Sequence, residues 1–355
     1  MRYYLKYRDF DVVSFDAAAQ EVEVLHKHFL PIQLQSVKHD FTMIRKFCSG
    51  RILMMNRKFC KDILTCYGVD DQTDLGICLA CSGLSFRDCY WLCPEDSRTS
   101  WKNINLFDNE FSFDLSKTAL TGIPSVPNDS VYTGELTGLG TRAKGFFRSG
   151  DKILLVKDES RDEINSEILT YYIARLLDLR CTKYENRIIF GKHCSVCALQ
   201  TSVDAELIPC RDYMELYQEH RLSWQSETYR AFMKTGGVDF VKMQILDYLI
   251  LNTDRNRDNY GMIRVNGSMA GMYPMFDHDS AFKGIGTNGI YFPSGMTFAD
   301  TLSYLKQTEE YASIRGNLQD FVKSLESDKV KELFLALKSI SVYQAVRERA
   351  KRLLD

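Results

Sequence analysis

The feature that most constrains this chain is a predicted β-hairpin around residue 266. The turn signal is Asn266-Gly267, and apolar stretches on both sides of it predict two strands, Tyr260–Val265 and Met269–Phe276. Counting back from the turn places Asp277 opposite Asn256. The hairpin is therefore predicted to return one carboxylate to the polar loop that precedes it.

That polar loop contains Asp254 and Asn259, separated by four residues. Together with Asp277 they would offer two carboxylates and an amide, which suits Mg²⁺ when substrate phosphates supply the other oxygen ligands. The spacing Asp-x-x-x-x-Asn is that of a kinase catalytic loop, where the Asp accepts a hydroxyl proton and the Asn holds a metal ion. The alternative is structural, because Asp and Asn are common turn and capping residues.

A glycine-rich segment lies far upstream, between Gly134 and Gly145. Glycine lets backbone N–H groups approach a phosphate closely, and Thr137, Thr141 and Lys144 could add hydroxyl and ammonium donors. The segment is not a Walker A sequence, so an ordinary surface loop is the alternative interpretation.

The residues after this segment predict two short strands, Phe146–Arg148 and Lys152–Lys157, joined by a turn at Ser149–Asp151. The order of loop, strand, turn and strand ending in Lys157 is the order in which a kinase N-lobe presents its phosphate-binding Lys. A solvated strand end is the alternative for the Lys157 side chain alone.

An amphipathic helix is predicted next, from Ile164 to Leu177, because its apolar residues form one stripe at helical period. Glu163 and Glu167 lie together on the polar edge of that stripe, and either could pair with Lys157. Glu167 is favoured, since a carboxylate in the first turn, such as Glu163, is already explained by the helix dipole.

Taken together, these residues resemble the HipA-like serine/threonine kinases of bacteria and phages, and the resemblance covers essentially the whole chain. The motifs are specific for this family when they occur together in this order, whereas each motif by itself is not. Residues from about 128 onward match the kinase core, and Asp88-Cys-Tyr-Trp91 is similar to a signature that precedes the core in many relatives. The matching core elements are the glycine-rich loop with Lys144, the strand with Lys157, the helix with Ser166-Glu167, the run Asn252–Asn259 and Phe276-Asp277.

The resemblance implies an α+β, bilobal protein-kinase-like fold with an N-terminal mixed α/β subdomain and a helical C-terminal lobe. It also implies transfer of the γ-phosphoryl group of ATP to a Ser/Thr hydroxyl of a protein, with Mg²⁺ as cofactor. Many relatives are toxins of toxin–antitoxin pairs, which makes an antitoxin a candidate partner, and loop autophosphorylation is known in the family. Neither the acceptor nor an antitoxin is identified by the sequence.

The resemblance assigns roles to individual residues. Asp254 would be the catalytic base, and Arg255 would position the loop or neutralise phosphate charge, with a solvated side chain as the alternative. Asn256 stands where many relatives carry His, but that position is not a metal ligand in the family and is no sign of inactivity. The remaining roles are Mg²⁺ binding by Asn259 and Asp277, phosphate contact by Lys157, an ion pair of Lys157 with Glu167, and ATP binding by Gly138, Gly140, Thr141, Lys144 and Leu199.

Composition agrees with this interpretation. The chain has 355 residues, 45% hydrophobic and 26% charged residues and a net charge of −2, which is typical of globular proteins with about two domains. The charge indicates no broad electrostatic binding to nucleic acid or membranes. No signal-peptide segment and no apolar run of transmembrane length are visible, so we expect a cytoplasmic protein.

Two cysteine patterns have alternatives. Cys78-x-x-Cys81, followed by Cys89 and Cys93, mimics zinc spacing, but the segment is apolar and has no His nearby, which favours buried thiols. In Cys194-x-x-Cys197, odd spacing on a predicted strand sends the two side chains to opposite faces, which disfavours a disulfide.

Three parts are predicted along the chain: a mixed α/β subdomain at 1–95, a kinase N-lobe with its connector at 96–200, and a helical C-lobe at 201–355. A polar connector is expected at 94–109, a turn-rich entry to the core at 121–130, and the crossing between lobes, where adenine would bind, at 198–201. Strands are expected at 3–7 and 12–15, and further helices at 41–47, 57–67, 211–217, 226–233, 239–251, 318–325 and 330–354.

The same residues are compatible with other functions. A pseudokinase or nucleotide-binding module would keep the fold without turnover, although all five key polar residues are present. A kinase could also act on a lipid or small molecule. A metal-dependent phosphodiesterase would use the acidic residues and leave the glycine-rich loop and Lys157 idle. Its acidic set would be Asp254, Asp258, Asp277 and Asp279.

Overall fold

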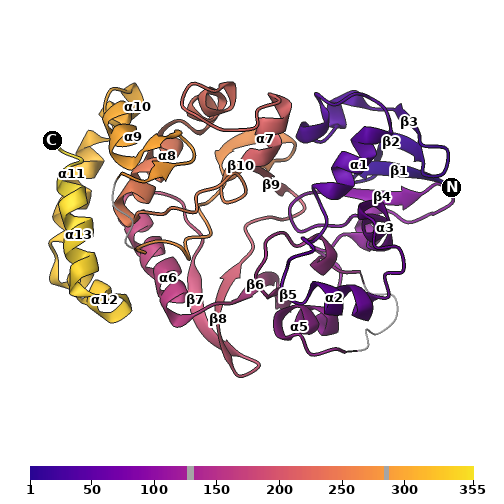
Figure 1. The fold of residues 1–355 in the computed structure, drawn as a ribbon, viewed down its shortest axis with the longest axis horizontal. Coiled ribbons are helices and arrows are strands. Elements are labelled where there is room, and N and C mark those ends of the chain that lie inside the picture. The colour runs from indigo at the N-terminus through magenta and orange to yellow at the C-terminus, as the bar shows by residue number, and fades with distance from the viewer. Residues whose placement is uncertain (126–131, 284–287) are drawn as a thin grey trace. The chain divides into compact units, whose positions relative to one another are not determined.

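The computed structural model describes residues 1–125, 132–283 and 288–355, and it has the predicted mixed α+β fold (Figure 1). The described chain divides into two compact units. Unit 1 comprises Met1–Asp158, Phe190–Lys192 and Thr201–Glu206, and unit 2 comprises Glu159–Ile189, His193–Gln200 and Leu207–Asp355. The three-part division at residues 95 and 200 stays a prediction, and the second half of the turn-rich segment 121–130, residues 126–130, lies outside the described residues.

Unit 1 begins with a four-stranded antiparallel sheet in the order β3-β2-β1-β4. The two predicted strands and two predicted helices of this region are confirmed. The predicted polar connector is partly wrong, because a helix, α4, lies within it. The elements are β1 (Arg2–Tyr7), β2 (Phe10–Asp16), β3 (Glu21–Val24), α1 (Phe41–Ser49), α2 (Cys60–Tyr67), α3 (Asp74–Ala80), β4 (Tyr90–Pro94), α4 (Trp101–Ile104) and α5 (Phe113–Thr121).

The motif Asp88–Trp91 is structural. Two parallel hydrogen bonds join Arg51 to Asp88, with Nη1 to Oδ2 at 2.9 Å and Nη2 to Oδ1 at 2.6 Å, and the arginine is buried. Trp91 Nε1 donates to the carbonyl of Arg8 at 2.7 Å. These bonds fasten β4 to β1 and to the chain after α1, so the motif stabilises the leading sheet.

The two strands predicted after the glycine-rich segment are confirmed as an antiparallel hairpin of β5 (Lys144–Ser149) and β6 (Lys152–Asp158). Gly150 in its turn has a positive φ of 61°. Before β5, a 3-10 turn, η3 (Glu135–Thr137), occupies the start of the glycine-rich segment.

Unit 2 begins with the predicted helix, α6 (Arg161–Leu176), which starts three residues earlier than expected. Ser160 and Glu163 form a capping box at its N-terminus, which explains Glu163 structurally. Strands β7 (Tyr184–Ile189) and β8 (Lys192–Ala198) follow.

The hairpin that follows the polar loop is confirmed, but it is shorter than expected. β10 (Gly261–Val265) pairs with β11 (Ser268–Met272), and β9 (Ala205–Pro209) pairs with β10 on its other side. Asn266 and Gly267 both have positive φ, as a primed turn requires. An irregularity between Met262 and Arg264 shifts the register, and Met275 instead bridges Cys181. The predicted strand to Phe276 and the pairing of Asp277 with Asn256 are therefore wrong.

The rest of unit 2 is mainly helical, as predicted. Helix α8 (Glu227–Ile250) merges two predicted helices across a kink at Gly237, where φ is 48° and ψ is −128°. The single helix expected at 330–354 is wrong, because it breaks at Lys338, and α12 packs against α6 and α13 (Figure 1). The other elements are α7 (Cys210–Leu216), β12 (Ile290–Tyr291), β13 (Met296–Thr297), α9 (Phe298–Leu305), α10 (Glu309–Ser313), α11 (Arg315–Leu325), α12 (Asp328–Leu337) and α13 (Ile340–Lys351).

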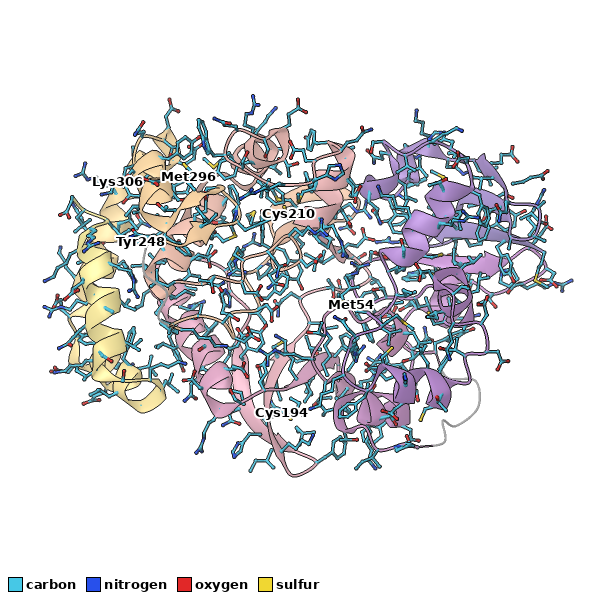
Figure 2. The ribbon with its side chains drawn as sticks, in the orientation of Figure 1. Met54, Cys194, Cys210, Tyr248, Met296 and Lys306 are labelled. Carbon is cyan, nitrogen blue, oxygen red and sulfur yellow. The ribbon has the colours of Figure 1, made fainter. Side chains whose placement is uncertain are left out.

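All eleven cysteines are free thiols, and nine of them are buried, including Cys194 and Cys210, which Figure 2 labels. Burial raises the pKa of the Cys81 thiol to about 12, so this side chain behaves as a small apolar group. In the described parts of the chain, no helix has the length and apolar character needed to cross a membrane.

Candidate functional site

The polar loop after α8 is anchored by a buried ion pair within unit 2. Arg255 donates from Nε to Asp247 Oδ2 at 2.9 Å and from Nη2 to Asp247 Oδ1 at 3.0 Å, and both side chains are fully buried. Tyr291 and Asn252 also donate to the Asp247 carboxylate, at 2.6 and 3.2 Å. A buried carboxylate with this many donors fixes the end of α8 and the start of the loop.

The same arginine connects the two ends of the site. Its Nη1 donates to the carbonyls of Asn259 at 2.5 Å and Phe276 at 2.9 Å. Burial alone would lower the pKa of Arg255, but the paired Asp247 carboxylate raises it, so the guanidinium stays protonated. The solvated alternative for Arg255 is wrong, and the side chain holds the loop next to Asp277.

Asp254 is half-buried, and both of its carboxylate oxygens accept hydrogen bonds from the loop. Asn256 Nδ2 donates to Oδ1 at 2.9 Å, and Asn259 Nδ2 donates to Oδ2 at 3.3 Å and to the Asp254 carbonyl at 2.8 Å. Asn256 therefore orients Asp254, a contact that the sequence analysis missed. Burial raises the pKa of Asp254, the bond from Asn256 opposes this, and the charges of Asp277 and Asp279 raise the pKa further. An oriented carboxylate with a raised pKa suits a general base.

Asp277 lies in a cluster of three acidic side chains. One carboxylate oxygen each from Glu159, Glu167 and Asp277 lies within 4.8 Å of the others. Asp277 has a positive φ of 62°, a strained conformation for a residue with a side chain, and its N–H donates to Tyr184 Oη at 3.3 Å. Hard carboxylate oxygens at this spacing fit Mg²⁺.

Glu159 was missed by the sequence analysis. It lies directly between the predicted strand and the N-cap of α6, where an acidic residue gives no periodic signal. The local sequence signal for its place beside Glu167 is its position between Lys157 and the capping box of α6.

Glu167 lies on the buried face of α6 and connects this helix to the segment after Asp277. Its Oε2 accepts from the N–H of His278 at 2.9 Å and lies 3.3 Å from His278 Nδ1. Glu163 instead caps the helix and lies 3.4 Å from Lys283 Nζ. The ion pair of Glu167 with Lys157 stays a prediction.

The glycine-rich loop lies in unit 1 together with Lys157, which is buried at the end of β6. Thr137 does not face a ligand, because its side chain is buried and Oγ1 donates to the carbonyl of Leu84 at 2.6 Å. The expectation that this hydroxyl meets a phosphate is therefore wrong. Thr141 is exposed, whereas Lys144 is half-buried as the first residue of β5.

Two glycines of the loop have a structural reason, a positive φ at Gly140 and a close neighbour at Gly138. Gly140 has a φ of 92°, and a Cβ added there would lie 2.7 Å from Lys144 Nζ. A Cβ added at Gly138 would lie 2.9 Å from Arg57 Nη1. Leu199 is half-buried just after β8, one residue before the chain passes from unit 2 to unit 1 after Gln200. ATP binding by these residues stays a prediction.

Comparison with known proteins identifies the fold. No protein-family model and no curated protein matches the sequence. The structure is similar to HipA from Shewanella oneidensis MR-1, solved with HipB and its operator DNA, with 12% identity and a TM-score of 0.59 over 99% of this chain and 96% of that one. A second match is the Helicobacter pylori proinflammatory kinase CtkA, with 16% identity and a TM-score of 0.43 over 59% of this chain and 94% of that one. The chain has a HipA-like kinase fold, as predicted.

Proposed function

We propose that this protein is an ATP- and Mg²⁺-dependent kinase that transfers the γ-phosphoryl group to a Ser or Thr hydroxyl of a protein. The observation that carries the proposal is the Asp254 carboxylate, which Asn256 and Asn259 orient and whose pKa is raised mainly by burial and further by the charge of Asp277. Phosphoryl transfer needs positioning and charge stabilisation more than covalent chemistry, and this site offers both.

In the proposed reaction, Asp254 orients the acceptor hydroxyl and takes its proton. The hydroxyl oxygen forms a bond to the γ-phosphorus while the bond from that phosphorus to the bridging oxygen breaks, and ADP leaves with the bond's electrons. Asn259 and Asp277 would hold Mg²⁺, which neutralises phosphate charge when bound. Glu159 and Glu167 supply further carboxylate oxygens next to Asp277.

ATP would be held mainly by residues of the glycine-rich loop and β6. Lys157 would contact the phosphates, and Leu199 would contact the adenine. The loop residues in this proposal are Gly138, Gly140, Thr141 and Lys144. Support comes from the HipA-like fold and from the order of these elements along the chain.

The proposal extends to a toxin role with an antitoxin partner, because the HipA to which this fold is similar was solved with HipB. Expression of wild type and of Asp254→Ala at equal levels tests this role. We expect that cells expressing wild type stop growing and that cells expressing Asp254→Ala grow normally. Normal growth with active wild-type kinase would contradict the toxin role and leave the kinase proposal intact.

Autophosphorylation is proposed at Thr141, whose exposure makes its hydroxyl accessible, whereas Thr137 is buried. A phosphate there would add about two negative charges beside the nucleotide and weaken ATP binding. Mass spectrometry of wild type and Asp254→Ala decides the source. Phosphate on Thr141 in both proteins would rule out autophosphorylation in cis.

The phosphodiesterase alternative gains no support from the structure. It requires Asp258 as one of four acidic groups, and Asp258 Oδ1 lies 3.3 Å from Arg211 Nε in an ion pair. A lipid or small-molecule acceptor is instead a question for the transfer experiment.

The proposed function is tested by incubating the purified protein with γ-labelled ATP, Mg²⁺ and a cell lysate. We expect label on protein Ser or Thr residues with wild type and none with Asp254→Ala. Binding of ATP without transfer to any acceptor would indicate a pseudokinase. Label only on lipids or small molecules would contradict the proposed protein acceptor.

A further inference from the structure

The glycine-rich loop is held by an arginine that lies outside it. Arg57, in the segment Leu53–Lys58 between α1 and α2, is buried. Its Nη1 donates to the carbonyls of Glu135 at 2.8 Å and Gly138 at 3.2 Å, and its Nη2 donates to the carbonyl of Lys144 at 2.8 Å. One guanidinium thus binds main-chain atoms at both ends of the loop.

The backbone of the same segment adds two more contacts. The N–H of Leu53 donates to the carbonyl of Leu136 at 2.7 Å, and the N–H of Lys58 donates to the carbonyl of Thr141 at 2.8 Å. All five contacted loop carbonyls therefore point toward Leu53–Lys58. In a trans peptide the C=O and the following N–H point in opposite directions, and the described chain has no cis peptide bond. The N–H of Leu139 consequently points away from this segment.

Glu135 fixes the arginine in place. Its Oε2 accepts from Arg57 Nη2 at 3.0 Å, its Oε1 accepts from the N–H of Phe146 at 2.7 Å, and both charged side chains are fully buried. Any side chain at Gly138 would meet the guanidinium, as described above. The glycine at this position is therefore explained by close approach of Arg57.

We infer that Arg57 is a positioning residue for the nucleotide phosphates, because it holds the loop carbonyls toward Leu53–Lys58, and the N–H of Leu139 then points to the opposite side, where we place the phosphates. The inference rests on the proposed function for the identity of the ligand. Arg57 acts through the loop and does not itself touch the nucleotide.

A matched control exists in the same unit. Arg51 is also buried, is paired with Asp88, and also donates to main-chain carbonyls, those of Gly83 and Tyr90, but it contacts no residue of the glycine-rich loop. If Arg57 merely stabilises unit 1, substitutions of the two arginine–carboxylate pairs should change stability and nucleotide affinity in the same way. If it positions the loop, the effects on phosphate binding should differ.

The test compares Arg57→Met/Glu135→Gln with Arg51→Met/Asp88→Asn. Changing both members of each pair avoids an unpaired buried charge, and Gln can still accept from Phe146 N–H. Affinities for ATP and for adenosine, which has no phosphates, are measured beside the melting temperature. We expect the Arg57 variant to bind ATP about tenfold more weakly, since the loop must then be ordered on binding, and to bind adenosine as wild type does. The Arg51 variant should keep the wild-type ratio of the two affinities.

Hydrogen exchange in nucleotide-free protein provides a second readout that does not depend on activity. Amides of residues 138–145 should exchange faster in the Arg57 variant and at the wild-type rate in the Arg51 variant. Unchanged exchange in the Arg57 variant, or equal losses of ATP and adenosine affinity, would overturn the inference. Failure of wild type to transfer phosphate would contradict the proposed function but not this loop-positioning role. Should Arg57→Met/Glu135→Gln not fold, Arg57→Lys, which lacks the planar fork, takes its place with the same expectations.

Discussion

The proposed catalytic loop and the glycine-rich loop are held in the same way, each by one buried arginine paired with a carboxylate. Arg255 pairs with Asp247 and binds the carbonyls of Asn259 and Phe276, at the two ends of the proposed catalytic region. Arg57 pairs with Glu135 and binds the carbonyls of Glu135 and Lys144, at the two ends of the glycine-rich loop. In both cases the arginine fixes backbone geometry and leaves the chemistry to other residues.

The two loops differ in how far the anchor lies from its target along the chain. Asp247 and Arg255 are 8 residues apart, whereas Arg57 lies 78 residues before Glu135 and 87 before Lys144. The proposed catalytic loop carries its anchoring arginine within its own motif. The glycine-rich loop is instead held by Leu53–Lys58, a segment in the leading part of the chain, so its geometry depends on residues far from its own motif.

The largest effect is expected for single substitutions of the arginines. Arg255→Met leaves Asp247 buried without its charge partner and should lower the free energy of unfolding by about 3–5 kcal/mol. Arg57→Met should cost a similar amount through Glu135. Urea denaturation measures both losses. A loss below about 1 kcal/mol for either variant would contradict an anchoring role for that arginine, whereas Arg255→Met/Asp247→Asn should recover part of the loss.

A second prediction separates the metal from the nucleotide. At a concentration of Mg²⁺-ATP about 100 times Kd, wild type should gain about 2.7 kcal/mol of stability, because the ligand binds the folded state alone. Asp277→Asn should lose most of that gain, since the variant lacks a metal-binding carboxylate. Thermal unfolding with ATP alone is the control. Equal stabilisation by ATP without metal in both proteins would show that the metal assignment is wrong.

The smallest effect concerns Asp254 in the absence of ligand. Its pKa is raised in the folded protein, so the folded state holds the proton more tightly and ionisation costs stability at any pH above the folded pKa. Asp254→Asn should therefore be more stable than wild type by about 0.5–1 kcal/mol at pH 7, as expected for a site that favours function over stability. The difference should shrink as the pH falls through the folded pKa. Melting temperatures of both proteins between pH 7 and pH 4 measure this difference. An Asp254→Asn variant that is less stable than wild type at pH 7 would contradict the prediction.

Locally determined features of the fold were predictable from sequence. The hairpin at Asn266-Gly267, the β5–β6 hairpin and helix α6 each depend on turn chemistry or periodicity within about twenty residues. The break at Lys338 also has a local signal, because Ser339 caps α13 by accepting from the N–H of Val342.

Contacts that are distant in sequence were not predictable in this way. Nothing in the sequence near Arg57 indicates that it contacts Glu135, and Glu159 joins Asp277 only after α6 and the hairpin have folded. The register shift in β10 moved Asp277 from its counted position, because one extra residue changes every pairing beyond it. Burial of the Thr137 hydroxyl against Leu84 likewise depends on a segment over fifty residues away.

The central claim is that Asp254 acts on the acceptor while other residues hold ATP. The most direct test measures ATP affinity and the rate of phosphoryl transfer in parallel for Asp254→Ala and Lys157→Ala. Asp254→Ala should bind ATP as wild type does and lose at least about 10²-fold in transfer rate, since its carboxylate stabilises the transition state more than the ground state. Lys157→Ala should weaken both ATP affinity and transfer. An Asp254→Ala protein that transfers phosphate at more than about a hundredth of the wild-type rate would contradict the claim.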